Sequence, residues 1–266
     1  MTFTTKNKND VWLSSTPSSS RRKQRQSHHH KQHQKQPLSS RLQLVQDKLD
    51  LAWLDSCIQI LKSCLENRAQ VPLANASQRD LYNVKCLGLG SPETSDNARA
   101  QLAFLLRTCD AFDIEYTRIS IYDPVFTNED KDLLVQLGMR VLDCESSDSS
   151  ETHPIHKSAV EEKGTTILFM PHCDLTLYES MLTTNWSVER LRSIVFICNH
   201  FDDYIQNNSI RTLESRAPHL LKIAPNVTSI PLPTSPDWPG AFNNTSVQFV
   251  TNENLDALVT EMDQKR

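Results

Sequence analysis

Several short stretches of the chain combine residue types that bind ligands or carry out catalysis. Each directly follows a run of apolar residues that predicts a strand. A glycine turn follows the first run, and a histidine with a cysteine follows the fourth. Acidic or amide groups follow the second, third and fifth. In a parallel sheet the carboxyl ends of the strands share one edge, so we expect these groups to meet there. The candidate ligand-binding residues are Gly88, Gly90, Asp123, Glu145, His172 and Asn199.

The Gly88-Leu89-Gly90 turn resembles part of a phosphate-binding loop. Its two glycines let backbone N–H groups approach a ligand at the start of the next helix. The third glycine of a dinucleotide fingerprint is replaced by Glu93, and Pro92 removes a donor. Asp123 lies 33 residues after Gly90, later than the usual ribose-binding acid but at the corresponding strand end. A cofactor site and a tight structural turn therefore remain as two interpretations.

His172 and Cys173 are the candidates for catalysis. Imidazole titrates near neutrality, so His172 is a candidate general base, and Cys173 is a candidate nucleophile. Adjacent strand residues point to opposite faces, so the two need not act together. The interpretation that we favour is a histidine and a small buried thiol at a strand end, with no catalytic role. We therefore assign no catalytic residue.

Other catalytic and metal-binding classes lack their motifs. The chain has no Cys-x-x-Cys pair, and outside the tail no histidine lies four residues from a second ligand, so we predict no metal site. It has five glycines, no Gly-x-Ser-x-Gly elbow and no P-loop, which disfavours a serine hydrolase and a P-loop nucleotide hydrolase. The cofactor, if there is one, stays unassigned.

The elements that must position these groups alternate between short apolar strands and helices. This alternation is typical of a parallel sheet covered on both faces. We therefore predict an α/β fold with a Rossmann-like, doubly wound, mostly parallel sheet and a 3-2-1-4-5 core order. The last strand is expected at an edge, with an antiparallel direction as one option, and proline-rich residues 225–240 are expected to be a loop. The predicted strands are Tyr82–Leu87, Arg118–Tyr122, Arg140–Leu142, Thr166–Met170, Ser193–Ile197 and Ser246–Val250.

The composition divides the chain into a tail and a single domain. Residues 1–40 hold eight Lys or Arg and one acid, hence +7; because the whole chain is −4, residues 41–266 carry −11. We predict that 1–40 is a disordered basic tail rich in Ser, Gln and His. Residues 41–72 are predicted to form an N-terminal helix that packs on the domain. The α/β domain is predicted at 80–255, with a mobile insertion at 146–164.

Charge, hydropathy and cysteine content narrow the location and the partners. No apolar stretch has the length of a membrane span and the N-terminal residues include no apolar h-region, so we expect neither a membrane span nor a secretory signal. Seven cysteines at scattered spacings favour reduced thiols in the cytoplasm or nucleus. An acidic domain is repelled by phosphates, so we expect no direct nucleic-acid binding by it. Arg21–Arg25 in the tail is either a nuclear import signal or a solvated low-complexity run.

Four sequence blocks and a closing block form a recognisable series along the chain. The blocks are Cys86–Ser91 with Ala98–Ala103, Tyr122–Thr127, Met170–Cys173 with Asn185 and Trp186, Ile194–Asn199, and Ala241–Ser246. Together they resemble the SRR-like family, named for "sensitivity to red light reduced". The resemblance covers about residues 80–250, with the blocks in the family's order. The chain departs from the family pattern beside Asn199, where Cys198 replaces a common glycine and His200 a small serine.

The resemblance implies a regulatory protein rather than a particular reaction. Members of the family are associated with circadian rhythm, light signalling and haem biosynthesis. It implies action in the cytoplasm and nucleus through protein partners, with no established catalytic activity. The alternative is an enzyme or sensor that binds a nucleotide-like ligand such as S-adenosylmethionine or a dinucleotide.

Overall fold

The structure is a computed structural model that describes residues 36–68, 82–142, 164–255 and 258. The chain divides into two units, Met1–Lys35 and Gln36–Arg266, and all described residues belong to the second. Most of the predicted tail and of the predicted insertion therefore lies outside the described residues, as does Glu145.

The described strands form one seven-stranded sheet in the order β3-β2-β1-β4-β5-β7-β6. The first five of these are parallel, which confirms the predicted fold class and the 3-2-1-4-5 core order. β7 is antiparallel to both of its neighbours. The strands are β1 (Tyr82–Leu87), β2 (Ile119–Tyr122), β3 (Arg140–Val141), β4 (Thr165–Met170), β5 (Ile194–Asn199), β6 (Val227–Pro231) and β7 (Thr245–Val250).

The prediction of a loop over residues 225–240 holds only for residues 232–238. The stretch also contains β6 and the start of the short helix α10 (Pro239–Phe242), and β6 rather than β7 forms the edge of the sheet. Proline cannot donate to a strand ladder, but an edge strand tolerates it at its end, as β6 does at Pro231. The prolines that indicated a loop therefore flank a strand and begin a helix.

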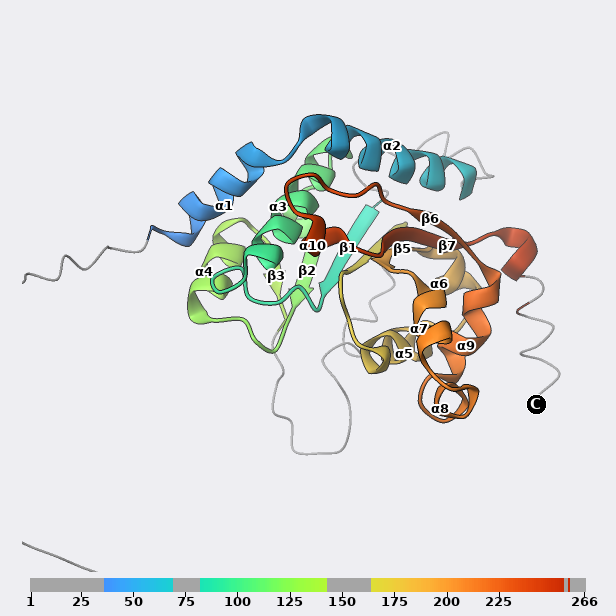
Figure 1. Cartoon of the computed structure of the whole chain (residues 1–266). Helices are drawn as coiled ribbons and strands as arrows, with labels where there is room; N and C mark the ends of the chain where they lie inside the picture. Colours follow the sequence, from blue (N-terminus) through green and yellow to red (C-terminus); the bar gives the residue numbers. More distant parts are fainter. Residues whose placement is uncertain (1–35, 69–81, 143–163, 256–257, 259–266) are drawn as a thin grey trace, which may run out of the picture. The chain divides into compact units, whose positions relative to one another are not determined.

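Helices cover both faces of the sheet, as a doubly wound fold requires (Figure 1). Two separate apolar clusters fill the two interfaces. One face carries α1 (Leu38–Lys48), α2 (Leu51–Arg68), α3 (Asp96–Ala111), α4 (Asn128–Gln136) and α10. The other carries α5 (Leu175–Thr184), α6 (Val188–Ser193), α7 (Phe201–Asn207), α8 (Ile210–Arg216) and α9 (Pro218–Ile223), with the 3₁₀ turn η4 (Ala224–Asn226); a second 3₁₀ turn, η2 (Tyr116–Arg118), precedes β2.

Strands β4 and β5 lie inside the sheet, and their runs Ile167–Met170 and Ile194–Cys198 are apolar without interruption. In β4, Ile167 and Phe169 join one cluster, whereas Leu168 and Met170 join the other. Alternate side chains of a strand point to opposite faces, so a strand buried on both faces needs an apolar residue at every position.

The N-terminal helical region differs from the single helix expected over residues 41–72. It begins at Leu38, which is only 2% exposed, so residues 38–40 belong to a helix and not to the tail. It is also divided at Leu49–Asp50, where Asp50 Oδ1 accepts a hydrogen bond from Trp53 N (2.7 Å) and starts α2. The indole N–H of Trp53 donates to Pro233 O (2.7 Å) and ties α2 to the segment after β6.

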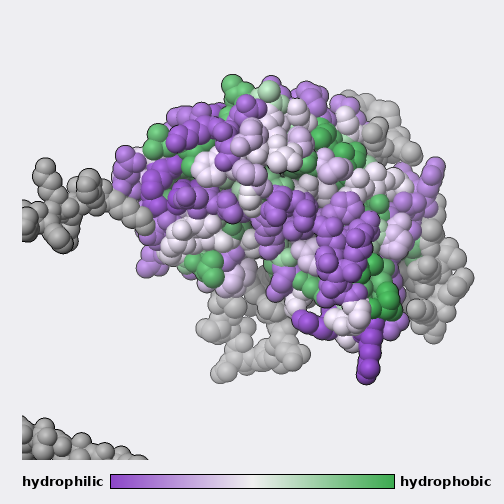
Figure 2. Space-filling view, viewed as in Figure 1, coloured by the Kyte–Doolittle hydropathy of each residue, from purple (hydrophilic) through white to green (hydrophobic). Residues whose placement is uncertain are grey.

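The surface face shown in Figure 2 is mainly hydrophilic, with hydrophobic residues in separate small areas. The most exposed large apolar residues come from different elements: Leu44, Leu51, Val125, Val135 and Ile210. None of the described helices has the length and apolar character needed to cross a membrane.

Candidate functional site

A cleft of about 690 Å³ opens at the carboxyl ends of β1, β2 and β4. Four of the predicted site residues line it, namely Gly88, Gly90, Asp123 and His172. The helix after β1 packs on one face of the sheet and the helix after β4 on the other, so the cleft lies at the topological switch point, where open α/β sheets bind ligands. Its volume is within the range of roughly 300–1,000 Å³ typical of small-molecule sites.

The glycine turn is held in a conformation that requires glycine at its first position. Gly88 has φ +67°, and a Cβ atom there would lie 2.4 Å from the Cys173 sulfur. Gly90 has φ +76°, but a Cβ there would meet only an ordinary contact at 3.6 Å. The structural interpretation of the turn therefore holds for Gly88: the β1–α3 turn packs directly on the β4–α5 turn, and the two together form the base of the cleft.

Asp123 connects the end of β2 to the glycine turn. Its Oδ2 accepts a hydrogen bond from Gly90 N (2.7 Å), and its Oδ1 accepts one from Val125 N (2.9 Å). The residue is 8% exposed, so these donors meet the carboxylate in a largely dry setting, where such bonds are strong. Asp123 therefore fixes the shape of the cleft wall in addition to facing the cleft.

Asp130 is a structural residue of the site that the sequence analysis missed. Its side chain is fully buried, and four donors surround its carboxylate. Ser91 Oγ (2.5 Å), Thr127 N (2.9 Å) and Thr127 Oγ1 (3.0 Å) donate to Oδ2, and Glu93 N (2.7 Å) donates to Oδ1. Asp130 thus joins the β1–α3 loop to the start of α4. The sequence signal was the capping box that Thr127 and Asp130 form.

His172 is exposed, and neighbouring groups engage both of its ring nitrogens. Its Nε2 lies 3.1 Å from Ala241 O, and since a carbonyl only accepts, Nε2 carries the hydrogen. Its Nδ1 lies 3.5 Å from Asn199 Nδ2, while Asn199 Oδ1 accepts a bond from His172 N (2.8 Å). The residue has φ +54°, a conformation that costs free energy unless its surroundings enforce it. Asn199 does not line the cleft but positions His172.

Ala241 joins two walls of the cleft at its backbone carbonyl. Besides facing His172, Ala241 O accepts a hydrogen bond from the side-chain amide of Gln101 (2.8 Å), a residue of α3 that is 3% exposed. His172 and Ala241 lie 69 residues apart in the chain, so the closing sequence block contacts the turn after β4 at the carbonyl oxygen of Ala241. The sequence order did not indicate this contact.

Cys173 does not have the character of a nucleophile. Burial raises the pKa of its thiol well above the ordinary value, and the nearby carboxylates of Asp174 and Asp123 raise it further. Its sulfur donates to Leu87 O (3.3 Å). The thiolate is the reactive form, so the thiol is inert at neutral pH.

We expect Cys173 and the other described cysteines to resist modification in the folded protein. All six are buried free thiols. The seventh cysteine, Cys144, lies outside the described residues, so the test uses a Cys144→Ser variant. At pH 8 a disulfide reagent should react with the folded variant about 100-fold more slowly than with the variant unfolded in urea, because reaction requires opening of the structure. Rapid modification of Cys173 in the folded protein, located by mass spectrometry, would show instead that its thiol is accessible and activated.

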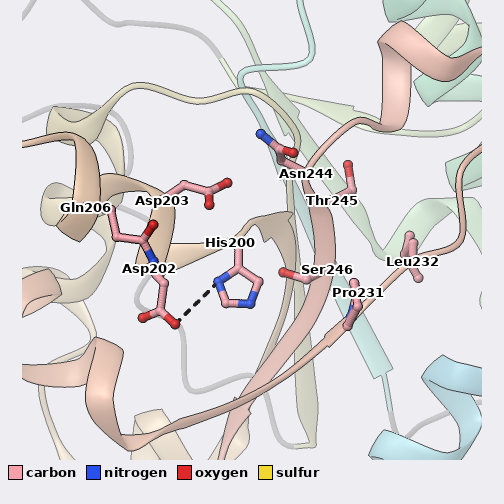
Figure 3. A pocket seen from close by; sticks show the side chains of 9 residues that line it. All are labelled: His200, Asp202, Asp203, Gln206, Pro231, Leu232, Asn244, Thr245 and Ser246. Carbon is pink, nitrogen blue, oxygen red and sulfur yellow. Dashed lines mark ion pairs between the residues drawn. The ribbon is translucent and has the colours of Figure 1, made fainter.

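A second, smaller cavity of about 310 Å³ lies beside the end of β5 (Figure 3). His200 faces Asp202 there, with 3.9 Å between His200 Nδ1 and Asp202 Oδ2. Ser246 of β7 lies on the opposite side of the His200 ring. His200 and Cys198 are the positions that depart from the family pattern, and neither lines the larger cleft. Among the described residues, no group of three or more His, Cys, Asp or Glu could hold a metal ion.

Fold and site together define a Rossmann-like α/β protein with a cleft at its switch point. Its glycine turn and acidic strand end follow the first and second strands, the positions at which this fold class binds nucleotides. Here the polar groups of the neighbouring turns bond to each other.

The chain belongs to the SRR1 domain family, whose model matches residues 42–249. It is 31% identical over 169 residues to an SRR1-like protein of Mus musculus, a match that covers 63% of each chain. It is 30% identical over 185 residues to Protein SENSITIVITY TO RED LIGHT REDUCED 1 of Arabidopsis thaliana, covering 69% of this chain and 63% of the relative. An SRR1-like protein of Drosophila melanogaster is 27% identical over 179 residues, covering 67% of this chain and 58% of the relative.

The family resemblance seen in the sequence blocks is therefore confirmed. The chain matches less than two thirds of the length of each of these relatives. No solved structure matches it.

Proposed function

We propose that this chain is an SRR-like regulatory protein whose state is set by a small organic ligand bound in the switch-point cleft. The observation that carries the proposal is the cleft itself: three strand ends and two helices enclose about 690 Å³ at the place where this fold class binds ligands. The rigid turns beneath it, held by Asp123 and Asp130, provide a preformed site.

The surroundings of the candidate catalytic groups favour binding over catalysis. His172 uses both ring nitrogens in contacts with the protein, and the Cys173 thiol stays neutral. A general base needs a free acceptor within reach of the substrate, and a nucleophile needs activation. His172 and Cys173 meet neither requirement.

The biological role follows the family. The Arabidopsis relative is named for reduced sensitivity to red light. For this chain we propose a role in circadian rhythm and clock gene expression and in the regulation of haem biosynthesis. It would act in the cytoplasm and nucleus through protein partners, with the domain making no direct contact to nucleic acid or membrane.

An enzyme or sensor that binds a nucleotide-like ligand is the second candidate. It is favoured by the position of Asp123, since an acid at the end of the second strand binds ribose in many Rossmann-like proteins. The two candidates share the cleft and differ in whether a reaction follows binding.

A side chain that fills the cleft should abolish regulation without unfolding the protein. Thr176 is exposed and lines the cleft from the first turn of α5, so Thr176→Trp places an indole in the ligand's space. In cells that lack the chain, we expect this variant to accumulate normally but to fail to restore the profile of clock gene transcripts. A stability change within about 0.5 kcal/mol is expected for an exposed position.

Val135→Trp is the matched control. Val135 is 61% exposed on α4 and does not line the cleft, so this variant should restore the profile fully. Full restoration by Thr176→Trp as well, at equal abundance, would show that the cleft has no part in regulation.

A further inference from the structure

Three backbone donors in and beside the glycine turn are already bonded within the protein. Gly90 N donates to Asp123 Oδ2 (2.7 Å), and Gly88 N donates to Tyr122 O (3.3 Å). Glu93 N donates to Asp130 Oδ1 (2.7 Å). In dinucleotide-binding proteins such N–H groups receive the pyrophosphate. A phosphate that bonded to Gly90 N would have to displace the carboxylate of Asp123.

The charges that line the cleft are negative. Asp123 and Asp174 contribute carboxylates, and no lysine or arginine among the described residues lines it. The guanidinium groups of Arg41 and Arg99 bond to the carbonyls of Glu93 and Pro92 in the same loop, but neither residue lines the cleft. A phosphate would therefore meet two carboxylates and no cationic side chain to balance its charge.

The helix that begins after β4 offers no anion site either. Asp174 is its N-cap and accepts a hydrogen bond from Leu177 N (2.8 Å), so a carboxylate of the protein already occupies that position. Helix N-termini attract anions through their free N–H groups and dipole. Here the same interaction is satisfied internally.

The remaining features suit an uncharged or cationic nucleoside. Asp123 accepts one bond at each oxygen, and a carboxylate has about four acceptor sites, so it retains capacity for ribose hydroxyls. Uncharged polar side chains also line the cleft and can bond to the edge of a base. These are Ser95, Asn97, Thr176 and Ser180.

We infer that the ligand of the cleft is a nucleoside that carries no phosphate, either neutral or positively charged, with its ribose hydroxyls on Asp123. This inference rests on the proposed function and names its ligand class. It separates S-adenosylmethionine and plain nucleosides from nucleotides and dinucleotides.

Calorimetric titration of the full chain with two sets of probes tests the inference. One set is adenosine, guanosine and S-adenosylmethionine, and the other is ADP, GDP and NAD⁺. The compared pairs are adenosine with ADP, guanosine with GDP, and S-adenosylmethionine with NAD⁺. In at least one pair we expect the phosphate-free probe to bind at least about 30-fold more tightly than the phosphate-bearing probe. Asn97→Lys, at an exposed position in the cleft lining, should narrow that difference about tenfold, whereas Val135→Lys, which adds the same charge away from the cleft, should leave it unchanged.

Tighter binding of ADP, GDP or NAD⁺ to the unmodified chain would overturn the inference. If no probe binds while the chain purified from its own cells retains another small molecule in the cleft, the nucleoside class is wrong and the proposed function stands. If no probe binds and nothing is retained, both fail.

Discussion

Asp130→Ala is expected to destabilise the protein by about 4 kcal/mol, the largest effect of any substitution that we predict. The carboxylate is fully buried and accepts hydrogen bonds from Ser91, Glu93 and Thr127. Its removal takes away the acceptor that these donors share and frees the β1–α3 loop from α4. Urea denaturation should show a lower midpoint with an unchanged slope.

Asp132 on the same helix provides the matched control. It is exposed, so Asp132→Ala removes the same charge from α4 at a cost of about 0.5 kcal/mol or less. Asp130→Asn keeps an acceptor oxygen and should fall between the two. Equal midpoints for Asp130→Ala and Asp132→Ala would contradict the view that Asp130 holds the cleft loops together.

Gly88→Ala is expected to cost about 3 kcal/mol, from a backbone term and a packing term of similar size. An L-residue at φ +67° is strained by about 1–2 kcal/mol, and overpacking of a tight contact costs about 1–3 kcal/mol. The contact is the 2.4 Å approach of the new Cβ to the Cys173 sulfur. Thermal or urea denaturation measures the sum.

Two further variants separate the terms. Gly90→Ala meets only a 3.6 Å contact and should show the backbone term alone. In a Cys173→Ala background the sulfur is absent, so Gly88→Ala should lose most of its packing term, a coupling of about 1–2 kcal/mol in a double-mutant cycle. If the effects of Gly88→Ala and Cys173→Ala on the free energy of unfolding are additive, the two turns are not in tight contact at this point.

The sequence predicted the sheet because its signals are local and repeated. The strands carry mostly apolar residues, and β1, β2, β4 and β5 are each followed by a helix, so the order of β1 to β5 could be derived from topology rules. β6 was missed because an edge strand that is only half buried lacks a continuous apolar run. The break at Leu49–Asp50 was missed because the apolar stripe continues across it.

The candidate site was partly predictable for a related reason. Strand ends place Gly88, Gly90, Asp123 and His172 at one edge in any parallel sheet, and all four line the cleft. What each side chain bonds to depends on contacts between distant segments. The engagement of His172 by Asn199 and Ala241 is of this kind, so no local pattern could indicate it.

Native mass spectrometry of the full chain, purified without denaturation from its own cells, tests the central claim most directly. We expect an additional non-covalent mass on the unmodified chain and on Val135→Trp that is lost on denaturation and is absent from Thr176→Trp. Absence of any retained small molecule from the unmodified chain, or the same mass on Thr176→Trp, would contradict the assignment of the cleft as a ligand site.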